Sequence, residues 1–115
     1  MQLTLRKTIN IMGFNGKEGS EVTLEEASRW TASYISTIEE GDVIALFVGK
    51  ENLQKILDQE ECMGIRFYFG IGDDGVKNLI AVGATRDEND MVDGVIMDRM
   101  LPCPPLCSSK NVLNS

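Results

Sequence analysis

The stretch Ile65–Ala84, IRFYFGIGDDGVKNLIAVGA, decides the fold of this chain. Both arms are rich in β-branched and aromatic residues, and in the first arm large apolar residues alternate with others. Between the arms stands Asp74-Gly75, a strong short-range signal for a chain reversal. The pattern predicts a β-hairpin over residues 65–84.

A two-residue loop at Asp74-Gly75 sets the expected register, in which Phe67 faces Val82. Because opposite residues share a face, one face then collects most of the apolar side chains: Ile65, Phe67, Phe69, Ile71, Ile80, Val82 and Ala84. An apolar face of this size has to be buried. We therefore expect a helix to cover Phe67 and Phe69.

Length and charge limit the remaining possibilities. The 115 residues, 43% of them hydrophobic, suit one α+β domain over residues 1–107 with a flexible tail at 108–115. The net charge of −7, from 18 acidic and 11 basic residues, repels phosphate backbones and anionic membranes. We expect neither nucleic acid nor a membrane as partner. No apolar run suits a signal peptide or a membrane span, which predicts a cytoplasmic protein.

Four further elements are expected around the hairpin. Residues 2–12 alternate between polar and apolar, as in an edge strand, and an exposed loop follows to residue 20. A capping box at Thr23 begins a helix over about residues 23–40, and a second helix is expected at about 51–60. Residues 43–48 predict a strand covered on both faces. The fold class is therefore α+β, with a mixed or mostly antiparallel sheet and both helices packed mainly on one face.

Several polar and aromatic side chains are candidates for binding. Trp30 and Tyr34 lie one turn apart on the first helix; we expect both to cover the sheet, with an aromatic ligand platform as the alternative. The other candidates lie on the hairpin and in the acidic loop after it: Arg66, Tyr68, Asp87 and Asp90. That acidic loop matches the calcium-loop pattern poorly, which favours a solvated loop.

The chain contains no histidine, which removes the usual general base and the imidazole ligands of most catalytic zinc sites. A carboxylate-dependent enzyme would have to use the acidic residues that crowd the loops around the hairpin: Asp73, Asp74, Asp87 and Asp90. No catalytic motif accompanies them, and Asp74 fits better as a turn residue. The sequence therefore favours a protein without enzymatic activity and assigns no catalytic residue.

Three cysteines, Cys62, Cys103 and Cys107, are candidates for a thiol-based metal or redox site. Two of them flank Pro104 and Pro105, and an extended segment would place them ~12 Å apart, beyond the ~7 Å limit for a disulfide. An internal disulfide there needs a turn after Pro105. A zinc site at all three would need a fourth ligand from an acid or a second chain. We expect the thiols to pack as small hydrophobic groups and assign no metal and no cofactor.

The order of landmarks along the chain resembles a group of small uncharacterised bacterial proteins. The shared landmarks are a capped helix containing Trp30, a short helix, the stretch ECMGIRFYFGIGDDG and the later PCPPLC. The resemblance covers about residues 23–107. It implies a stand-alone cytoplasmic domain and implies no activity.

The favoured function is a non-enzymatic protein-binding domain whose acidic surface meets a basic protein partner, as in an adaptor or a toxin-neutralising protein. A homodimer is compatible with this hypothesis. The alternatives are a thiol-based metal or redox site and a carboxylate-dependent enzyme.

Overall fold

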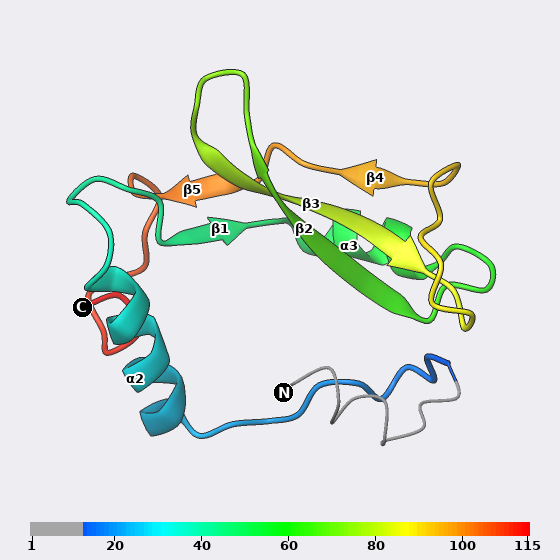
Figure 1. The fold of residues 1–115 in the computed structure, drawn as a ribbon, viewed down its shortest axis with the longest axis horizontal. Helices are drawn as coiled ribbons and strands as arrows, with labels where there is room; N and C mark the ends of the chain where they lie inside the picture. The colour runs from blue at the N-terminus through cyan, green and yellow to red at the C-terminus, as the bar shows by residue number, and fades with distance from the viewer. Residues whose placement is uncertain (1–12) are drawn as a thin grey trace.

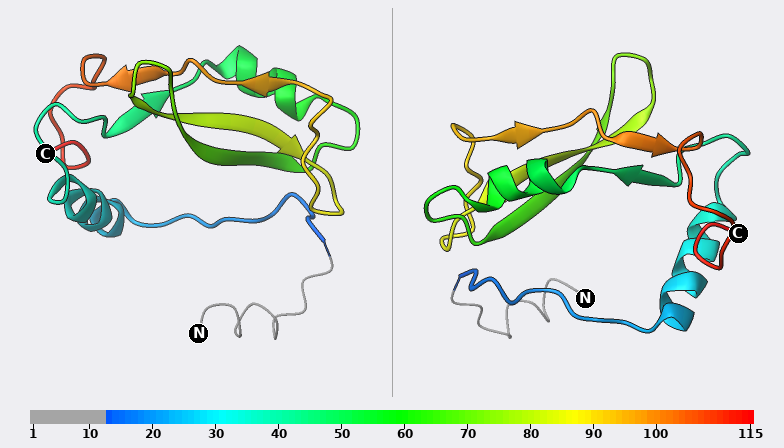
Figure 2. Two further views of the ribbon diagram at one scale, coloured as in Figure 1. Left: turned by 45° about the horizontal axis from the view of Figure 1, so that its top comes forward. Right: turned by 180° about the vertical axis from the view of Figure 1, so that it is seen from behind.

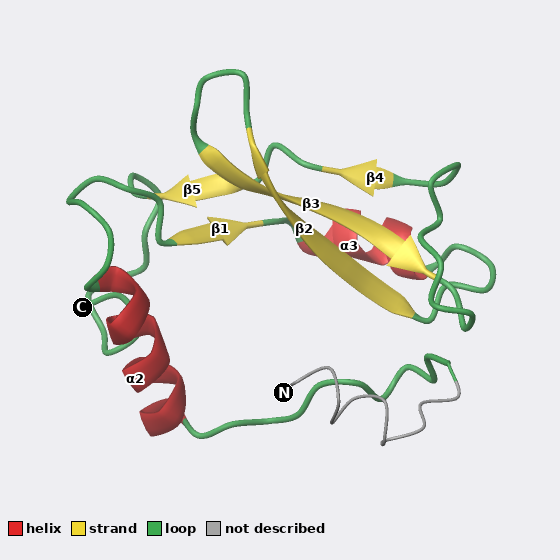
Figure 3. Ribbon diagram, in the orientation of Figure 1, coloured by secondary structure: helices red, strands yellow, loops and turns green. Residues whose placement is uncertain are grey.

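The computed structural model describes residues 13–115, so the strand predicted over residues 2–12 lies outside the described part. The elements are α2 (Leu24–Ile35), β1 (Ala45–Phe47), α3 (Lys50–Leu57), β2 (Gly64–Ile71), β3 (Lys77–Ala84), β4 (Ile96–Met97) and β5 (Leu101–Cys103) (Figure 1). The strands form two antiparallel sheets, β2-β3-β4 and β1-β5 (Figure 3). The predicted α+β class and the hairpin are confirmed.

The register of the hairpin differs from the prediction by one residue. Phe67 faces Ala81, not Val82, and Phe69 faces Leu79. The loop contains three residues instead of the predicted two, because Gly72 and Val76 form the closing pair, in which Gly72 N–H donates to Val76 O (2.9 Å). Gly75 ends the loop with a φ of +80°, the left-handed position that a three-residue hairpin loop requires.

The expected cover of the aromatic face is also wrong. Phe69 is 93% exposed and Phe67 is 45% exposed. The hydrophobic residues buried in the described part include three from β3 and none from β2: Ile56, Ala81, Val82, Ala84, Met100 and Cys103. Helix α3 contributes Ile56 to the core that contains Ala81. The core is therefore centred on the middle strand, and the rings of the edge strand extend beyond it.

Helix α2 does not cover the three-stranded sheet as predicted. Its start is as expected, since the Thr23 side chain accepts the Glu26 N–H (3.1 Å), but it ends at Ile35. Directly after that end, Thr37 donates its hydroxyl to Tyr34 O (2.7 Å), a local bond that competes with further helix. No residue of α2 is buried, and the helix lies beyond the end of the β1-β5 sheet, beside the C-terminal segment (Figure 2).

The strand predicted over residues 43–48 was expected to be covered on both faces. Instead β1 is short and pairs with β5 in a separate sheet, where Ala45 faces Cys103. Phe47 in β1 is 63% exposed. The apolar composition of residues 43–48 therefore predicted a strand correctly, but the strand is less deeply buried than that composition indicated.

Gln59, directly after α3, joins the helix to the loop before β4. Its Nε2 donates to Ile56 O (2.9 Å), and its Oε1 accepts Val95 N–H (2.7 Å). The glycines beside it leave no room for a side chain: a Cβ on Gly94 would lie 2.1 Å from Gln59 Oε1, and one on Gly83 would lie 3.0 Å from Nε2. The amide therefore fixes the loop against the helix.

We expect Gly75→Val to lower the free energy of unfolding by about 1–3 kcal/mol, because a β-branched residue resists a positive φ. The matched control is Gly64→Val, since Gly64 has no heavy atom near an added Cβ and no positive φ. Urea denaturation of both variants checks this. Equal losses would contradict the turn geometry.

We expect Gln59→Ala to cost about 1–2 kcal/mol of unfolding free energy, because it leaves the partly buried Val95 N–H without its partner. Gln54→Ala removes the same group from an exposed site, where Gln54 bonds Asp58 (2.7 Å), and should cost less than about 0.5 kcal/mol. Thermal or urea unfolding of the two variants measures the difference. A loss at Gln54 as large as that at Gln59 would refute the bridging role.

Candidate functional site

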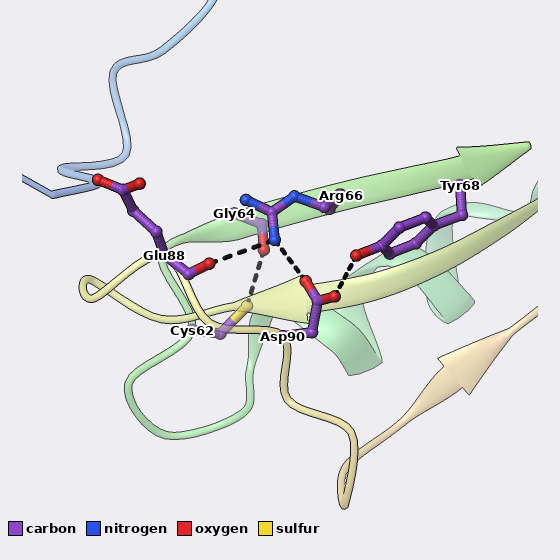
Figure 4. A network of polar contacts seen from close by, with 6 residues as sticks. All are labelled: Cys62, Gly64, Arg66, Tyr68, Glu88 and Asp90. Atoms are coloured by element: carbon purple, nitrogen blue, oxygen red, sulfur yellow. Dashed lines mark hydrogen bonds and ion pairs between the residues drawn. The ribbon is translucent and has the colours of Figure 1, made fainter. Parts of the chain in front are cut away.

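Three polar side chains meet at the start of the hairpin. Arg66 and Tyr68 are two residues apart on β2 and therefore lie on the same face of the sheet. Asp90 reaches them from the loop before β4, where it forms a β-bridge with Ala84. Arg66 Nη1 lies 2.5 Å from Asp90 Oδ1 and the Tyr68 hydroxyl donates to Oδ2 (Figure 4). Arg66 also donates to Glu88 O (3.3 Å).

The charges in this cluster compensate one another. The Tyr68 hydroxyl, and then the Arg66 guanidinium, hold the pKa of Asp90 below its usual range. The hydrogen bond to Asp90 in turn raises the pKa of Tyr68. Asp90 is thereby a weaker base and Tyr68 a weaker acid than free side chains, which is the opposite of what general acid–base catalysis near neutral pH requires.

The loop before α2 packs against the same cluster. The ring centroid of Phe14 lies 5.3 Å from the guanidinium carbon of Arg66, and Phe14 N–H donates to Arg86 O (2.8 Å). Glu18 holds this loop in shape, because its carboxylate accepts the N–H groups of Asn15 (2.9 Å) and Gly16 (3.0 Å), which lower its pKa. A hollow of about 270 Å³ lies between this loop and the first residues of β2.

The acidic candidates are divided between the two ends of the hairpin. Asp73 and Asp74 lie in its loop, whereas Asp87 and Asp90 lie beyond the far end of β3 (Figure 1). Asp74 Oδ1 accepts Val76 N–H (3.0 Å), which makes it the turn residue that the sequence indicated. A cavity of about 560 Å³ includes Asp73 and Asp74 in its lining but neither Arg66 nor Tyr68. The structure does not bring the four carboxylates together.

The cysteines do not converge on one point. Cys103 and Cys107 form a disulfide with a Cα–Cα distance of 4.7 Å, so the expectation of an extended segment with two packed thiols is wrong. The chain turns back where Leu106 N–H donates to Pro102 O (2.9 Å). Cys62 is free, and its Sγ donates to Gly64 O (3.2 Å). Residues 13–115 contain no group of three metal-ligating side chains.

The aromatic residues of α2 are exposed, Trp30 at 56% and Tyr34 at 42%, so neither covers the sheet as expected. Tyr34 does reach the hairpin: Lys77 Nζ lies 3.4 Å from its hydroxyl and 5.7 Å from its ring centroid. Trp30 and Tyr34 are not part of the Arg66 cluster.

The outer edge of β2 was not anticipated as a site. The hydrogen bonds of two residue pairs show which backbone groups of β2 point toward β3. In the pair Gly72–Val76, Gly72 N–H donates across the hairpin to Val76 O. In the pair Ile65–Gly83, Gly83 O instead accepts Met91 N–H (2.8 Å) on the other side of β3. Since bonding alternates along an antiparallel ladder, the odd-numbered residues of β2 point their backbone groups away from β3. In the described residues no strand pairs with that side.

The side chains on this edge are apolar and exposed. Phe67, Phe69 and Ile71 share one face of the sheet, and Ile71 is 75% exposed. We call these side chains, with the free backbone groups of β2, the open edge. The sequence indicated the apolar alternation but gave no signal that β2 would be the outer strand.

We expect Tyr68→Phe to raise the pKa of Asp90 toward its ordinary value, because the hydroxyl that contributes most to lowering it is gone. A carboxyl group whose pKa is lower in the folded than in the unfolded state stabilises the folded protein at pH values above the unfolded-state pKa. This stabilisation is lost as the pH falls through the folded-state pKa. The wild-type unfolding free energy should therefore fall below about pH 4, and less so in the variant. Carbon-detected NMR titration of Asp90 measures the pKa.

The matched control for this titration is Tyr34→Phe, because the Tyr34 hydroxyl donates to Val43 O (3.5 Å), outside the Asp90 cluster. It should leave the pKa of Asp90 unchanged. An unchanged Asp90 pKa in Tyr68→Phe would show that the hydroxyl does not control the carboxylate.

Within residues 13–115, none of the helices is long and apolar enough to cross a membrane. A scan against protein-family models and searches of the curated proteins and the solved structures find no match to this chain. The resemblance to small bacterial proteins therefore stays a prediction.

Proposed function

We propose that this protein is a non-enzymatic interaction domain that binds an extended, basic segment of a partner protein as an added strand on the open edge. The observation that carries the proposal is that no strand within residues 13–115 pairs with the outer backbone groups of β2, beside the exposed side chains of Phe67, Phe69 and Ile71. Strand addition uses the backbone groups for affinity and the alternate side chains for specificity.

The size of the exposed surface supports a partner. The chain exposes 9144 Å², whereas a folded monomer of 12.7 kDa exposes about 6,200 Å². Subtracting the surface of an unfolded chain for residues 1–12, about 2,100 Å², still leaves the rest about 1,300 Å² above the value for its mass. One partner in a stable interface contributes about 800 Å², so the surplus is large enough for a protein-binding site.

The charge supports a basic partner. The chain carries a net charge of −7, and the only charged residue of β2, Arg66, is paired with Asp90. An acidic domain attracts basic segments at long range, and an edge with its one charge neutralised does not repel them. The cytoplasmic location stays a prediction from the sequence. The Cys103–Cys107 disulfide is instead typical of an oxidising compartment.

A labelled peptide of about ten residues that alternates valine and lysine tests the proposal, because it has the length of a strand and the expected charge. We expect it to bind with a Kd of about 10–100 μM, a free energy of about −5.5 to −7 kcal/mol, in fluorescence anisotropy. Phe69→Thr should weaken binding at least about tenfold through lost apolar contact area. Phe47→Thr makes the same change at another exposed phenylalanine and should leave the affinity unchanged.

Two further peptides separate strand addition from simple charge attraction. A valine–glutamate peptide should not bind, and a valine–lysine peptide methylated at alternate backbone nitrogens should lose binding because it cannot donate to β2. Equal binding of the methylated and unmethylated peptides, or of wild type and Phe69→Thr, would refute the proposal.

A further inference from the structure

We propose that the Cys103–Cys107 disulfide is a thiol-exchange site that a dithiol reductant opens at the exposed Cys107 sulfur, and that its opening releases the C-terminal residues 108–115 from the cavity that they cover. This site involves neither the open edge nor the partner proposed for it. Three observations carry the inference: the unequal burial of the two cysteines, the short ring that they close, and the way in which residues 108–115 are held.

The two sulfurs of the disulfide differ in access to solvent. Cys103 belongs to β5 and is 6% exposed, and its backbone O accepts the Ile44 N–H (2.8 Å). Cys107 is exposed, in the turn that follows β5. Access is one of the factors that decide which sulfur of a disulfide an incoming thiolate attacks. A reductant from solution therefore meets the Cys107 sulfur, and Cys103 is the leaving group.

The exchange takes place in two balanced steps. One thiolate of the dithiol bonds to Cys107 Sγ while the Cys103–Cys107 bond breaks, and Cys103 Sγ leaves with the electron pair and takes a proton from water. The second thiolate of the reagent then attacks the reagent's own sulfur in the mixed disulfide, which releases Cys107 as a thiol in the same way. The protein disulfide is reduced by two electrons, and the dithiol is oxidised to a cyclic disulfide.

The disulfide closes a short ring, because the two cysteines are four positions apart in the sequence. A disulfide stabilises a fold mainly by restricting the unfolded chain, and this effect grows with the length of the closed loop. β5 also has its own backbone pairing with β1, in which Ala45 faces Cys103. We therefore expect reduction to open the turn after β5 and to leave the rest of the domain folded.

Residues 108–115 depend on this ring for their position. Within the described part of the chain, each of their hydrogen bonds joins two members of the same segment, as where Asn111 Nδ2 donates to Ser109 O (3.0 Å). The segment lies beside α2 (Figure 2). Together with α2 and the β1-β5 sheet it lines a cavity of about 480 Å³, so it covers the sheet there without packing tightly on it.

The first readout identifies the sulfur that is attacked. The full-length protein with Cys62→Ser keeps the disulfide and lacks the free thiol, so only two sulfurs can react. It is exposed briefly to glutathione, a monothiol, and quenched with acid before the adduct is located by mass spectrometry. We expect at least about tenfold more glutathione on Cys107 than on Cys103. An adduct found mainly on Cys103 would overturn the assignment.

The second readout is the effect of reduction on the folded wild-type chain. We expect dithiothreitol to speed hydrogen exchange at least about tenfold at Leu106 N–H, which donates to Pro102 O (2.9 Å) in the turn, and to leave exchange at Ile44 N–H unchanged. The amide order parameters of residues 108–115 should fall below about 0.6. Cys107→Ser should show both changes without a reductant, whereas Cys62→Ser, which keeps the disulfide, should match the oxidised wild type.

Three outcomes of this experiment would overturn the inference. If residues 108–115 keep their order parameters after reduction and in Cys107→Ser, apolar contacts hold the segment and the disulfide does not. If Ile44 N–H exchanges faster to the same degree as Leu106 N–H, the bond supports the whole β1-β5 sheet. If dithiothreitol reduces the bond only after a denaturant has unfolded the protein, the folded chain contains no exchange site.

Discussion

The three-residue loop at the tip of the hairpin determines which side chains this domain buries and which it presents. Gly72 and Val76 close the loop, and Gly75 completes it with a positive φ. Side chains along a strand alternate between faces, so one residue more or less in the loop changes every pairing along β2 and β3. The observed loop pairs Phe67 and Phe69 with Ala81 and Leu79. Arg66 and Tyr68 alternate with these rings along β2 and therefore lie together on the other face, where Asp90 meets them.

The middle position of β3 explains why the exposed apolar side chains of the three-stranded sheet lie on β2, at one edge of the sheet. β3 lies between β2 and β4, and its last residues, Ala81–Ala84, are all buried. Small residues there allow neighbours to approach closely: a Cβ on Gly83 would lie within 3.1 Å of Cys62, Gln59 and Met91 atoms. The elements that cover the sheet are therefore held against β3 and the loop before β4. Within residues 13–115, no element gives the large rings of β2, one strand further out, a comparable cover.

Features that depend on neighbouring residues could be predicted from the sequence, whereas features that depend on contacts between distant segments could not. The Thr23 cap, the two helices and both arms of the hairpin follow from neighbouring residues. Asp74-Gly75 fits both a two-residue and a three-residue loop, because each places a glycine at positive φ, so the register could not be predicted from the turn alone. The position of α2, the separate β1-β5 sheet and the pairing of Cys103 with Cys107 depend on contacts between distant or turning segments that no local pattern encodes.

An open edge is hazardous unless it is used or covered, and the residues of β2 carry little of the usual protection. Proteins protect such edges with lysine, proline, bulges or inward charges. β2 has neither lysine nor proline, and its one charge, on Arg66, is neutralised by Asp90. Neutralisation stabilises the start of the hairpin but removes the repulsion that would keep other strands away. An added strand would therefore meet neither an unpaired like charge nor a proline along β2.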